Sequence, residues 1–311
     1  MEHRSPSYLP IVIIIAIFAV STASLFIKLA QREAPSLVIA AVRLTLASLL
    51  LAPSAFSNYK NEIRGFTKKE SLLIIISGFF LALHFATWIS SLEYTSVASS
   101  VIIVSTGPLW VALLSSLFLH EKLTKTVFWG MILAVSGGTI IAISDSCSWQ
   151  GGLLCPPLTT FLHGKSLFGD ILALFGALTV TGYLLIGRKL RVKISLIPYI
   201  FLVYSIAATV LIVLMVIAGQ TPFGYSINIY IWLFLLALIP QIIGHSTYNW
   251  ALRFLPATFV AVTTLGEPIG ATILAFFILN ETPGFFKLGG AIIILVGIFI
   301  ATRTKKEVRS D

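Results

Sequence analysis

Charged side chains are scarce in this sequence. Only 11% of the 311 residues are Asp, Glu, Lys or Arg, whereas 57% are hydrophobic and the mean hydropathy is +0.98. A soluble domain has too little interior to bury that much apolar surface. The composition therefore excludes a soluble globular protein and favours an integral membrane protein.

Cysteines and recognisable enzyme motifs are also scarce. Cys147 and Cys155 are the only cysteines, which is too few for a cysteine-based metal site. Both fall in the connection 144–166, which we expect outside the cell, where a disulfide or two reduced thiols remain open alternatives. The sequence has no P-loop, GxSxG or HExxH motif, which argues against an enzyme and against ATP-driven transport by this chain alone. We expect no metal and no cofactor.

Long apolar stretches are abundant instead. Crossing a bilayer takes roughly 20 apolar residues per helix, and the alternating pattern of a membrane β-barrel is absent. We therefore predict an all-α integral membrane protein with ten transmembrane helices. The predicted spans are Tyr8–Leu29, Ser36–Phe56, Ser71–Leu92, Val97–Leu119, Val127–Ile143, Leu167–Ile186, Ile194–Ile217, Ile229–Leu252, Ala257–Leu279 and Phe285–Thr302.

The ten stretches form two sequence-related blocks of five. Four landmarks of the first block recur in the second at one constant offset of 160 residues: Pro108 with Pro268, Glu121 with Glu281, Gly130 with Gly290, and Gly137 with Gly297. Five spans per block place the second block upside down, an architecture typical of secondary transporters. We predict two inverted five-helix repeats, 8–143 and 167–302, joined by the external connection 144–166 and followed by a cytoplasmic tail, 303–311.

The net charge of +9 is explained by orientation in the membrane. With the N-terminus inside, sixteen of the 21 Lys and Arg residues fall in cytoplasmic segments and four in external ones. This predicts a cell-membrane protein with both termini in the cytoplasm and no nucleic-acid partner. Lys28 and Arg188, at equivalent ends of the first span of each block, are expected to extend to the interface as anchors.

Four ionisable residues fall inside the predicted spans: Arg43, His84, His245 and Glu267. Each costs roughly 2.5–3.5 kcal/mol at the centre of a membrane helix, so such residues tend to face a cavity or a partner. Arg43 is expected either to neutralise a substrate carboxylate or to hold helices together.

Glu267 is the strongest of the candidates because it lies near mid-depth and precedes Pro268. That proline removes a backbone hydrogen bond, which we expect to leave the carbonyl of Thr264 free. Pro108 breaks the equivalent helix of the first block, and paired broken helices indicate a transport site and a means of gating. The alternative is a structural carboxylate paired with Arg43 or a histidine.

The third and eighth spans each carry a stripe of polar and aromatic residues, at the same depth in the membrane. His84 and Trp88 are four residues apart on the third span, and Trp88 is equivalent to Tyr248. The stripe on the eighth span consists of Gln241, His245, Tyr248 and Asn249. We predict that His84, Trp88, His245, Tyr248 and Asn249 line a pocket for a small organic solute, with interhelical hydrogen bonding as the alternative.

These motifs resemble a known family. The matching segments are Thr106–Trp110 with Leu119–Thr124, and Gly266–Gly270 with Leu279–Thr282, together with Arg43 in Ala41–Ala47. They are similar to the repeats of the drug/metabolite transporter superfamily, in its ten-helix EamA-like branch. The resemblance implies ten helices around a central cavity and transport of amino acids, other metabolites or drugs, often outward.

The function predicted from the sequence is secondary transport. We expect export of a small metabolite such as an amino acid by alternating access, with Pro108 and Pro268 allowing gating. The alternatives are a flippase for a lipid-linked substrate, an intramembrane enzyme using His84, His245 and Glu267, and an assembly subunit without a cavity. Proton coupling and a homodimer remain open, as do the substrate and the direction of transport.

Overall fold

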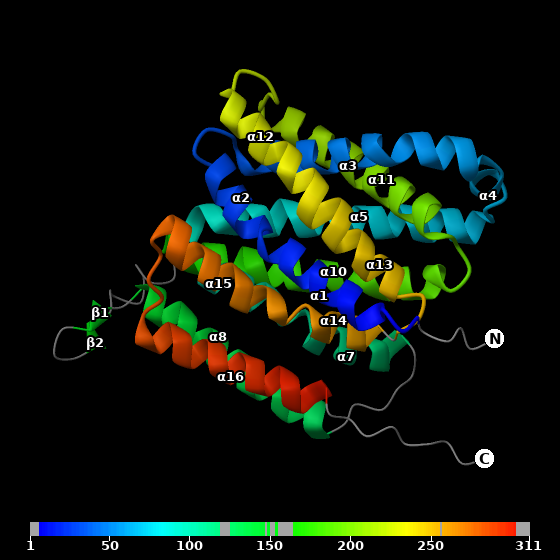
Figure 1. The fold of residues 1–311 in the computed structure, drawn as a ribbon. Helices are drawn as coiled ribbons and strands as arrows, with labels where there is room; N and C mark the ends of the chain where they lie inside the picture. Colours follow the sequence, from blue (N-terminus) through cyan, green and yellow to red (C-terminus); the bar gives the residue numbers. More distant parts are fainter. Residues whose placement is uncertain are drawn as a thin grey trace, which may run out of the picture.

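The computed structural model describes residues 6–118, 125–146, 148–149, 153–154, 164–255 and 257–302. Almost all of these residues are helical (Figure 1). The exception is a short antiparallel pair, β1 (Ser148–Trp149) and β2 (Leu153–Leu154), in the connection between the blocks. Cys147, Cys155, Glu121 and the tail 303–311 lie outside the described residues.

The first block contains the helices of predicted spans one to five. They are α1 (Leu9–Ser21), α2 (Ala23–Ala30), α3 (Ser36–Asn58), α4 (Lys60–Arg64), α5 (Lys68–Tyr94), α6 (Val97–Val104), α7 (Gly107–Phe118) and α8 (Lys125–Ser146).

The second block repeats this order. Its elements are α10 (Lys165–Arg191), α11 (Leu196–Ile217), α12 (Ile227–Leu236), the π-helix η1 (Ala237–His245), α13 (Ser246–Ala251), α14 (Ala257–Thr263), α15 (Gly266–Leu279) and α16 (Phe285–Thr302).

The lengths of these helices match a membrane protein. Among the described residues, eight helical spans are long and apolar enough to cross a bilayer. Two shorter apolar helices, Phe128–Gly138 in α8 and Phe285–Gly297 in α16, occupy the places of the predicted fifth and tenth spans. Large apolar side chains such as Phe18, Ile217 and Phe277 are at least 70% exposed, as expected of a surface that faces lipid. The all-α integral membrane fold is confirmed.

The two blocks are interleaved through pairs of helices. The closest packing joins α8 to α16, α5 to α10, and α3 to α11, each pair taking one helix from each block. Figure 1 shows α8 and α16 side by side at one edge of the bundle. Each block therefore depends on the other for a buried surface.

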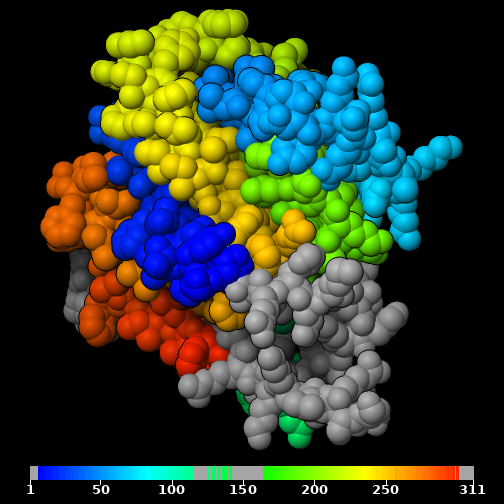
Figure 2. Space-filling view, turned by 45° about the vertical axis from the view of Figure 1, so that its right-hand side comes forward, coloured from blue at the N-terminus to red at the C-terminus, as the bar shows by residue number. Residues whose placement is uncertain are grey.

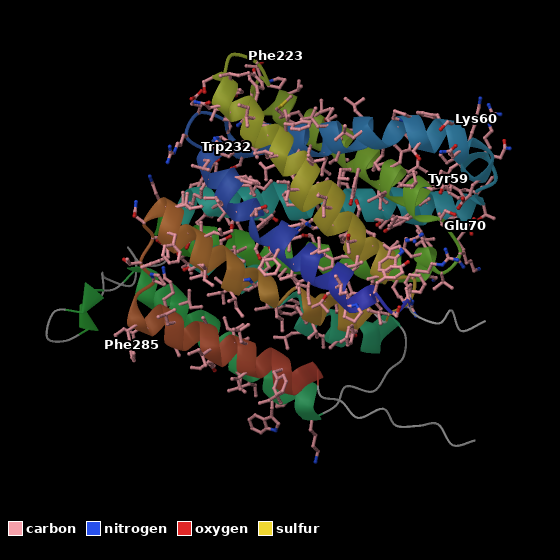
Figure 3. The ribbon with its side chains drawn as sticks, viewed as in Figure 1. Tyr59, Lys60, Glu70, Phe223, Trp232 and Phe285 are labelled. Carbon is pink, nitrogen blue, oxygen red and sulfur yellow. The ribbon has the colours of Figure 1, made fainter. Side chains whose placement is uncertain are left out.

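The bundle has two distinct ends. Figure 3 places Tyr59, Lys60 and Glu70 at one end and Phe223 and Phe285 toward the other. We name the first the basic end and the second the outer end, following the predicted orientation.

Lys28 and Arg188 each cap the end of a neighbouring helix. Lys28 Nζ donates to the carbonyl of Leu92 at the end of α5, and Arg188 Nη1 donates to the carbonyl of Leu252 at the end of α13 (2.6 Å). Both pairs are related by the 160-residue offset. Carbonyls in the last turn of a helix lack intrahelical partners, which makes a nearby cation favourable there.

A second pair of bonds repeats the same symmetry. Gln31 Nε2 donates to the carbonyl of Ile89 (2.8 Å), and Arg191 Nε donates to the carbonyl of Asn249 (3.0 Å). The two donors, Gln31 and Arg191, are 160 positions apart, and so are the two acceptors, Ile89 and Asn249. The sequence repeat is therefore also a repeat of side-chain contacts.

Gly137 and Gly290 are predicted to be required for the α8–α16 contact. A Cβ at Gly137 would lie 2.6 Å from the carbonyl oxygen of Gly290, whereas a Cβ at the adjacent Gly138 meets nothing within 4 Å. We expect Gly137→Ala to destabilise the protein by about 1–3 kcal/mol through overpacking. Thermal unfolding of purified protein in detergent measures this, with Gly138→Ala as the control. Equal melting temperatures for the two variants would contradict the contact.

Candidate functional site

A central cavity lies between the two blocks. It encloses about 630 Å³, including the space at its open mouth. Its lining comes from five predicted spans: His84, Trp88, Val104, Ser105, Gly107, Pro108, Val180, Tyr183, Leu184, His245, Tyr248, Ala261, Thr264 and Glu267.

The cavity includes six of the nine predicted site residues. His84, Trp88 and Pro108 come from the first block, and His245, Tyr248 and Glu267 from the second. Residues up to 183 positions apart in the sequence thus meet in one place. The remaining three, Arg43, Asn249 and Pro268, are not among the lining residues.

Arg43 lies one layer behind the cavity wall. Its guanidinium carbon is 4.2 Å from the centre of the Phe85 ring, and that ring is 5.3 Å from the ring of His245. Arg43 is fully buried, and its Nε donates to Gln241 Oε1 (2.9 Å). A cation over an aromatic face is stabilised by the ring quadrupole. In this conformation Arg43 acts on the cavity through its electric field.

Asn249 supports the cavity without lining it. Its side-chain amide donates to the carbonyl of His245 (2.8 Å) and to the hydroxyl of Tyr183. Tyr183 itself lines the cavity from α10. Tyr183 was not among the residues predicted from the sequence; a tyrosine hydroxyl inside a transmembrane span was the available signal.

Aromatic rings form the walls. The rings of His84 and Trp88 are stacked, with centroids 5.7 Å apart and an interplanar angle of 11°. His84 Nδ1 lies 2.9 Å from the carbonyl of Gly176, so this nitrogen carries the proton as a donor. His245 lies 6.4 Å from His84 and 6.5 Å from Tyr248, between centroids.

Two hydrogen-bond donors in the lining lack partners. Trp88 Nε1 and the Tyr248 hydroxyl are buried, and neither is hydrogen-bonded within the described part of the chain. A buried donor without an acceptor costs about 1–3 kcal/mol. These two groups are therefore available to a solute or to water in the cavity.

Glu267 supplies the carboxyl group of the cavity among the described lining residues. No Lys or Arg is among the described lining residues, and Arg43 attracts the Glu267 carboxylate from behind Phe85. The position equivalent to Glu267 in the first block is Gly107. The two-fold arrangement of the fold therefore carries one carboxylate and not two.

Both predicted helix breaks are present. The helix is interrupted between α6 and α7 at Ser105–Thr106, and between α14 and α15 at Thr264–Leu265. The expectation that the carbonyl of Thr264 is free is wrong, because Glu267 N donates to it (2.9 Å). Such i+3 bonds replace the bond that Pro268 cannot make.

The π-helix η1 was not expected from the sequence. It contains Pro240, and Ser246 Oγ donates to the carbonyl of Gln241 (3.2 Å). Because the π-helix has a wider turn, the residues of the predicted stripe do not all point to the same side of the helix. Gln241 faces Arg43, whereas His245 and Tyr248 face the cavity. π-helical segments are frequent at functional sites.

Three glycines of the second block allow α1 to pack closely on it. In the second block, a Cβ at Gly244 or Gly266 would lie 2.5 Å from Val20 or Ile17 of α1, and Gly270 packs equally closely on Ser21. Figure 2 shows α1 (blue) seated against the gold and orange segments of that block.

The first block has larger residues at the equivalent positions: His84, Thr106 and Trp110. α10, the counterpart of α1, packs on α5, α6 and α7, and the cavity lies beside this contact.

Comparison with known proteins identifies relatives along the whole chain. The description of the EamA-like transporter family matches residues 9–143 and again 167–303. An uncharacterized transporter of Archaeoglobus fulgidus is 25% identical over 91% of this chain and 93% of its own.

Two relatives have named substrates. The pseudopaline exporter CntI of Pseudomonas aeruginosa is 21% identical, covering 94% of this chain and 95% of its own. An S-adenosylmethionine uptake transporter of Rickettsia felis is 24% identical, covering 88% and 85%. A solved crystal structure has the same fold, with a TM-score of 0.66 at 16% identity over 96% of this chain and 97% of the other.

Gln241 is predicted to be required for tolerating the buried Arg43. Gln241→Leu removes the acceptor of Arg43 Nε and should lower the free energy of unfolding by about 3 kcal/mol, because a buried charged donor is left unpaired. Gln241→Glu keeps an acceptor of nearly the same shape and should be closer to wild type. Thermal unfolding in detergent compares the two. A Leu variant as stable as the Glu variant would contradict this role.

Proposed function

Because the chain belongs to the EamA-like transporter family, we propose that it exports a small amine-bearing metabolite, such as an amino acid, across the cell membrane by alternating access. The observation that carries this proposal is the position of Glu267. It supplies a negative charge to an aromatic cavity at the junction of two broken helices. Sites at such junctions between inverted repeats are typical of secondary transporters.

The lining suits an ammonium group. The Glu267 carboxylate would pair with it, and the faces of Trp88, Tyr248 and Tyr183 would contribute cation–π attraction. Multiply charged anions are disfavoured because the described lining contains no Lys or Arg.

The same cavity has donors for an acceptor group on the substrate. The unpaired Trp88 Nε1 and Tyr248 hydroxyl would donate to a carboxylate or amide oxygen. An amino acid carries both an ammonium and a carboxylate, which matches this combination. His84 and His245 would shape the wall, and His84, whose Nδ1 proton is donated to Gly176, would present Nε2 as an acceptor.

Glu267 also provides a site for proton coupling. A carboxylate that holds a proton cannot also hold an ammonium group by charge, so the two ligands compete. Exchange of a proton for the substrate at Glu267 would couple export to the proton gradient. Arg43 and Pro268 would support this exchange from outside the lining, and Pro108 and Pro268 would allow the helices to bend at the breaks.

The topology follows the predicted repeats, 8–143 and 167–302, with both termini in the cytoplasm. The basic bias of the sequence and the two family matches support this arrangement. Export agrees with the named function of the Pseudomonas relative, whereas the Rickettsia relative is named for uptake. Direction is therefore part of the test.

Glu267→Gln is predicted to abolish coupled transport. In proteoliposomes loaded with labelled amino acids and amines, wild-type protein should give saturable release that depends on a pH gradient. The variant should release substrate at least about tenfold more slowly and without response to the gradient, because the charge-assisted bond and the proton site are both lost.

The control for this assay is Glu33→Gln, which changes an exposed carboxylate at the outer end. It should transport as wild type does. Wild-type flux and pH dependence in Glu267→Gln, in protein that is folded by size-exclusion chromatography, would contradict the proposed site.

Trp88→Phe and Tyr248→Phe are predicted to weaken substrate binding specifically. Each change keeps an aromatic side chain, although a smaller one at position 88, and removes one donor, so KM should rise about fivefold while kcat stays near wild type. Tyr94→Phe is the matched control, because Tyr94 packs on Phe168 away from the cavity. Unchanged KM in both cavity variants would show that these donors do not contact the substrate.

A further inference from the structure

A second pocket lies at the outer end of the bundle. It has a volume of about 400 Å³, including open space, and lies between the start of α6 and the α15–α16 turn. Its lining residues are Ser96, Ala98, Thr272, Ala275, Glu281, Thr282, Pro283 and Lys287.

Two hydrogen bonds join the repeats beside this pocket. Glu281 Oε2 accepts from the backbone N–H of Val97, the first residue of α6 (3.0 Å). Lys287 Nζ donates to Ser96 Oγ (2.9 Å). Glu281 and Lys287 belong to the second block, and Ser96 and Val97 to the first.

The local backbone directs Glu281 toward α6. Asn280 ends α15 in the left-handed conformation (φ 57°), and Glu281 N donates back to the carbonyl of Ala275 (3.2 Å). This closing turn brings the Glu281 side chain to the start of α6, where unpaired N–H groups and the helix dipole favour a carboxylate. Lys28 lies close enough to attract Glu281 electrostatically.

The helices held at the outer end are the ones that form the central cavity. α6 runs from Val97 to Val104 at the cavity, and α15 runs outward from Glu267 to the Glu281 turn. The central cavity extends to Ala261, toward the basic end, but does not include the equivalent Val101, toward the outer end. The cavity is thus displaced away from the bonded outer end.

We propose that Glu281 and Lys287 form a clamp that closes the outer pocket in this conformation, and that the pocket is the exit route when the clamp opens. The clamp consists of the Glu281–Val97 and Lys287–Ser96 hydrogen bonds. This proposal rests on the proposed function in one respect: the protein must alternate between a closed and an open outer end. Breaking the clamp shifts the population toward the open state, as expected when contacts specific to one state are removed.

The experiment measures accessibility of the outer pocket. Ala98 is only 5% exposed and lines this pocket, so Ala98→Cys serves as a reporter in a background with Cys147→Ser and Cys155→Ser. Cells are treated with a membrane-impermeant thiol reagent, and the labelling rate is measured. Glu281→Ala should raise the rate about tenfold, and Glu281→Gln, which keeps an acceptor oxygen, should raise it less.

Two further variants make the result decisive. Lys287→Met removes the second bond and should also raise labelling. Glu33→Ala is the matched control: Glu33 accepts from Ser226 N (2.9 Å) at the same end and also joins the two blocks, but outside the cavity-forming helices. The labelling rate of the reporter with Glu33→Ala should equal that of the reporter with the clamp intact.

Unchanged labelling in both Glu281→Ala and Lys287→Met would overturn the clamp, as would an equal increase in Glu33→Ala. The assay needs no substrate, so it is independent of the amine proposal. Increased labelling together with no amine or amino-acid flux would support the clamp and reject the proposed substrate class.

Discussion

The close approach of α1 to the second block is the constraint on which the rest of the structure depends. Gly244, Gly266 and Gly270 leave no side chains in the interface, so backbone and short side chains of α1 fill the space completely. In lipid there is no hydrophobic drive between helices, and such tight packing supplies the attraction instead. The equivalent residues of the first block are the larger His84, Thr106 and Trp110, and the central cavity is lined by His84 on that side, beside α10.

The chemistry of that cavity follows from the same departure from symmetry. Glu267 corresponds to Gly107, so one repeat supplies a carboxylate where the other supplies only backbone. The broken helices bring backbone and polar side chains to the middle of the membrane, which is tolerated where they line a cavity or are buried in protein. Arg43 is held behind Phe85, where its charge influences the cavity without closing it to a cation. Binding of an amine and binding of a proton are both consistent with this single carboxylate.

The contacts that occur equivalently in both repeats have a different role, because they join helices of the same repeat. Lys28 and Arg188 cap equivalent helix ends, and Gln31 and Arg191 bond equivalent carbonyls, each within its own repeat. These bonds hold neighbouring helices together inside each repeat. The Glu281 and Lys287 bonds instead cross from one repeat to the other at the outer end.

The sequence by itself determined the membrane class, the helical spans and the duplicated landmarks, and it indicated most of the cavity lining. These features depend on local hydropathy, on proline chemistry and on a constant offset, all of which can be read along one chain. It also predicted the helix breaks at Pro108 and Pro268, although not the bond from Glu267 N to Thr264. Only the tertiary structure decided that η1 divides the Gln241–Asn249 stripe, that Tyr183 joins the lining and that Arg43 lies behind Phe85. Those outcomes depend on which helices approach closely through space, and the periodicity of a single helix contains no information about its neighbour.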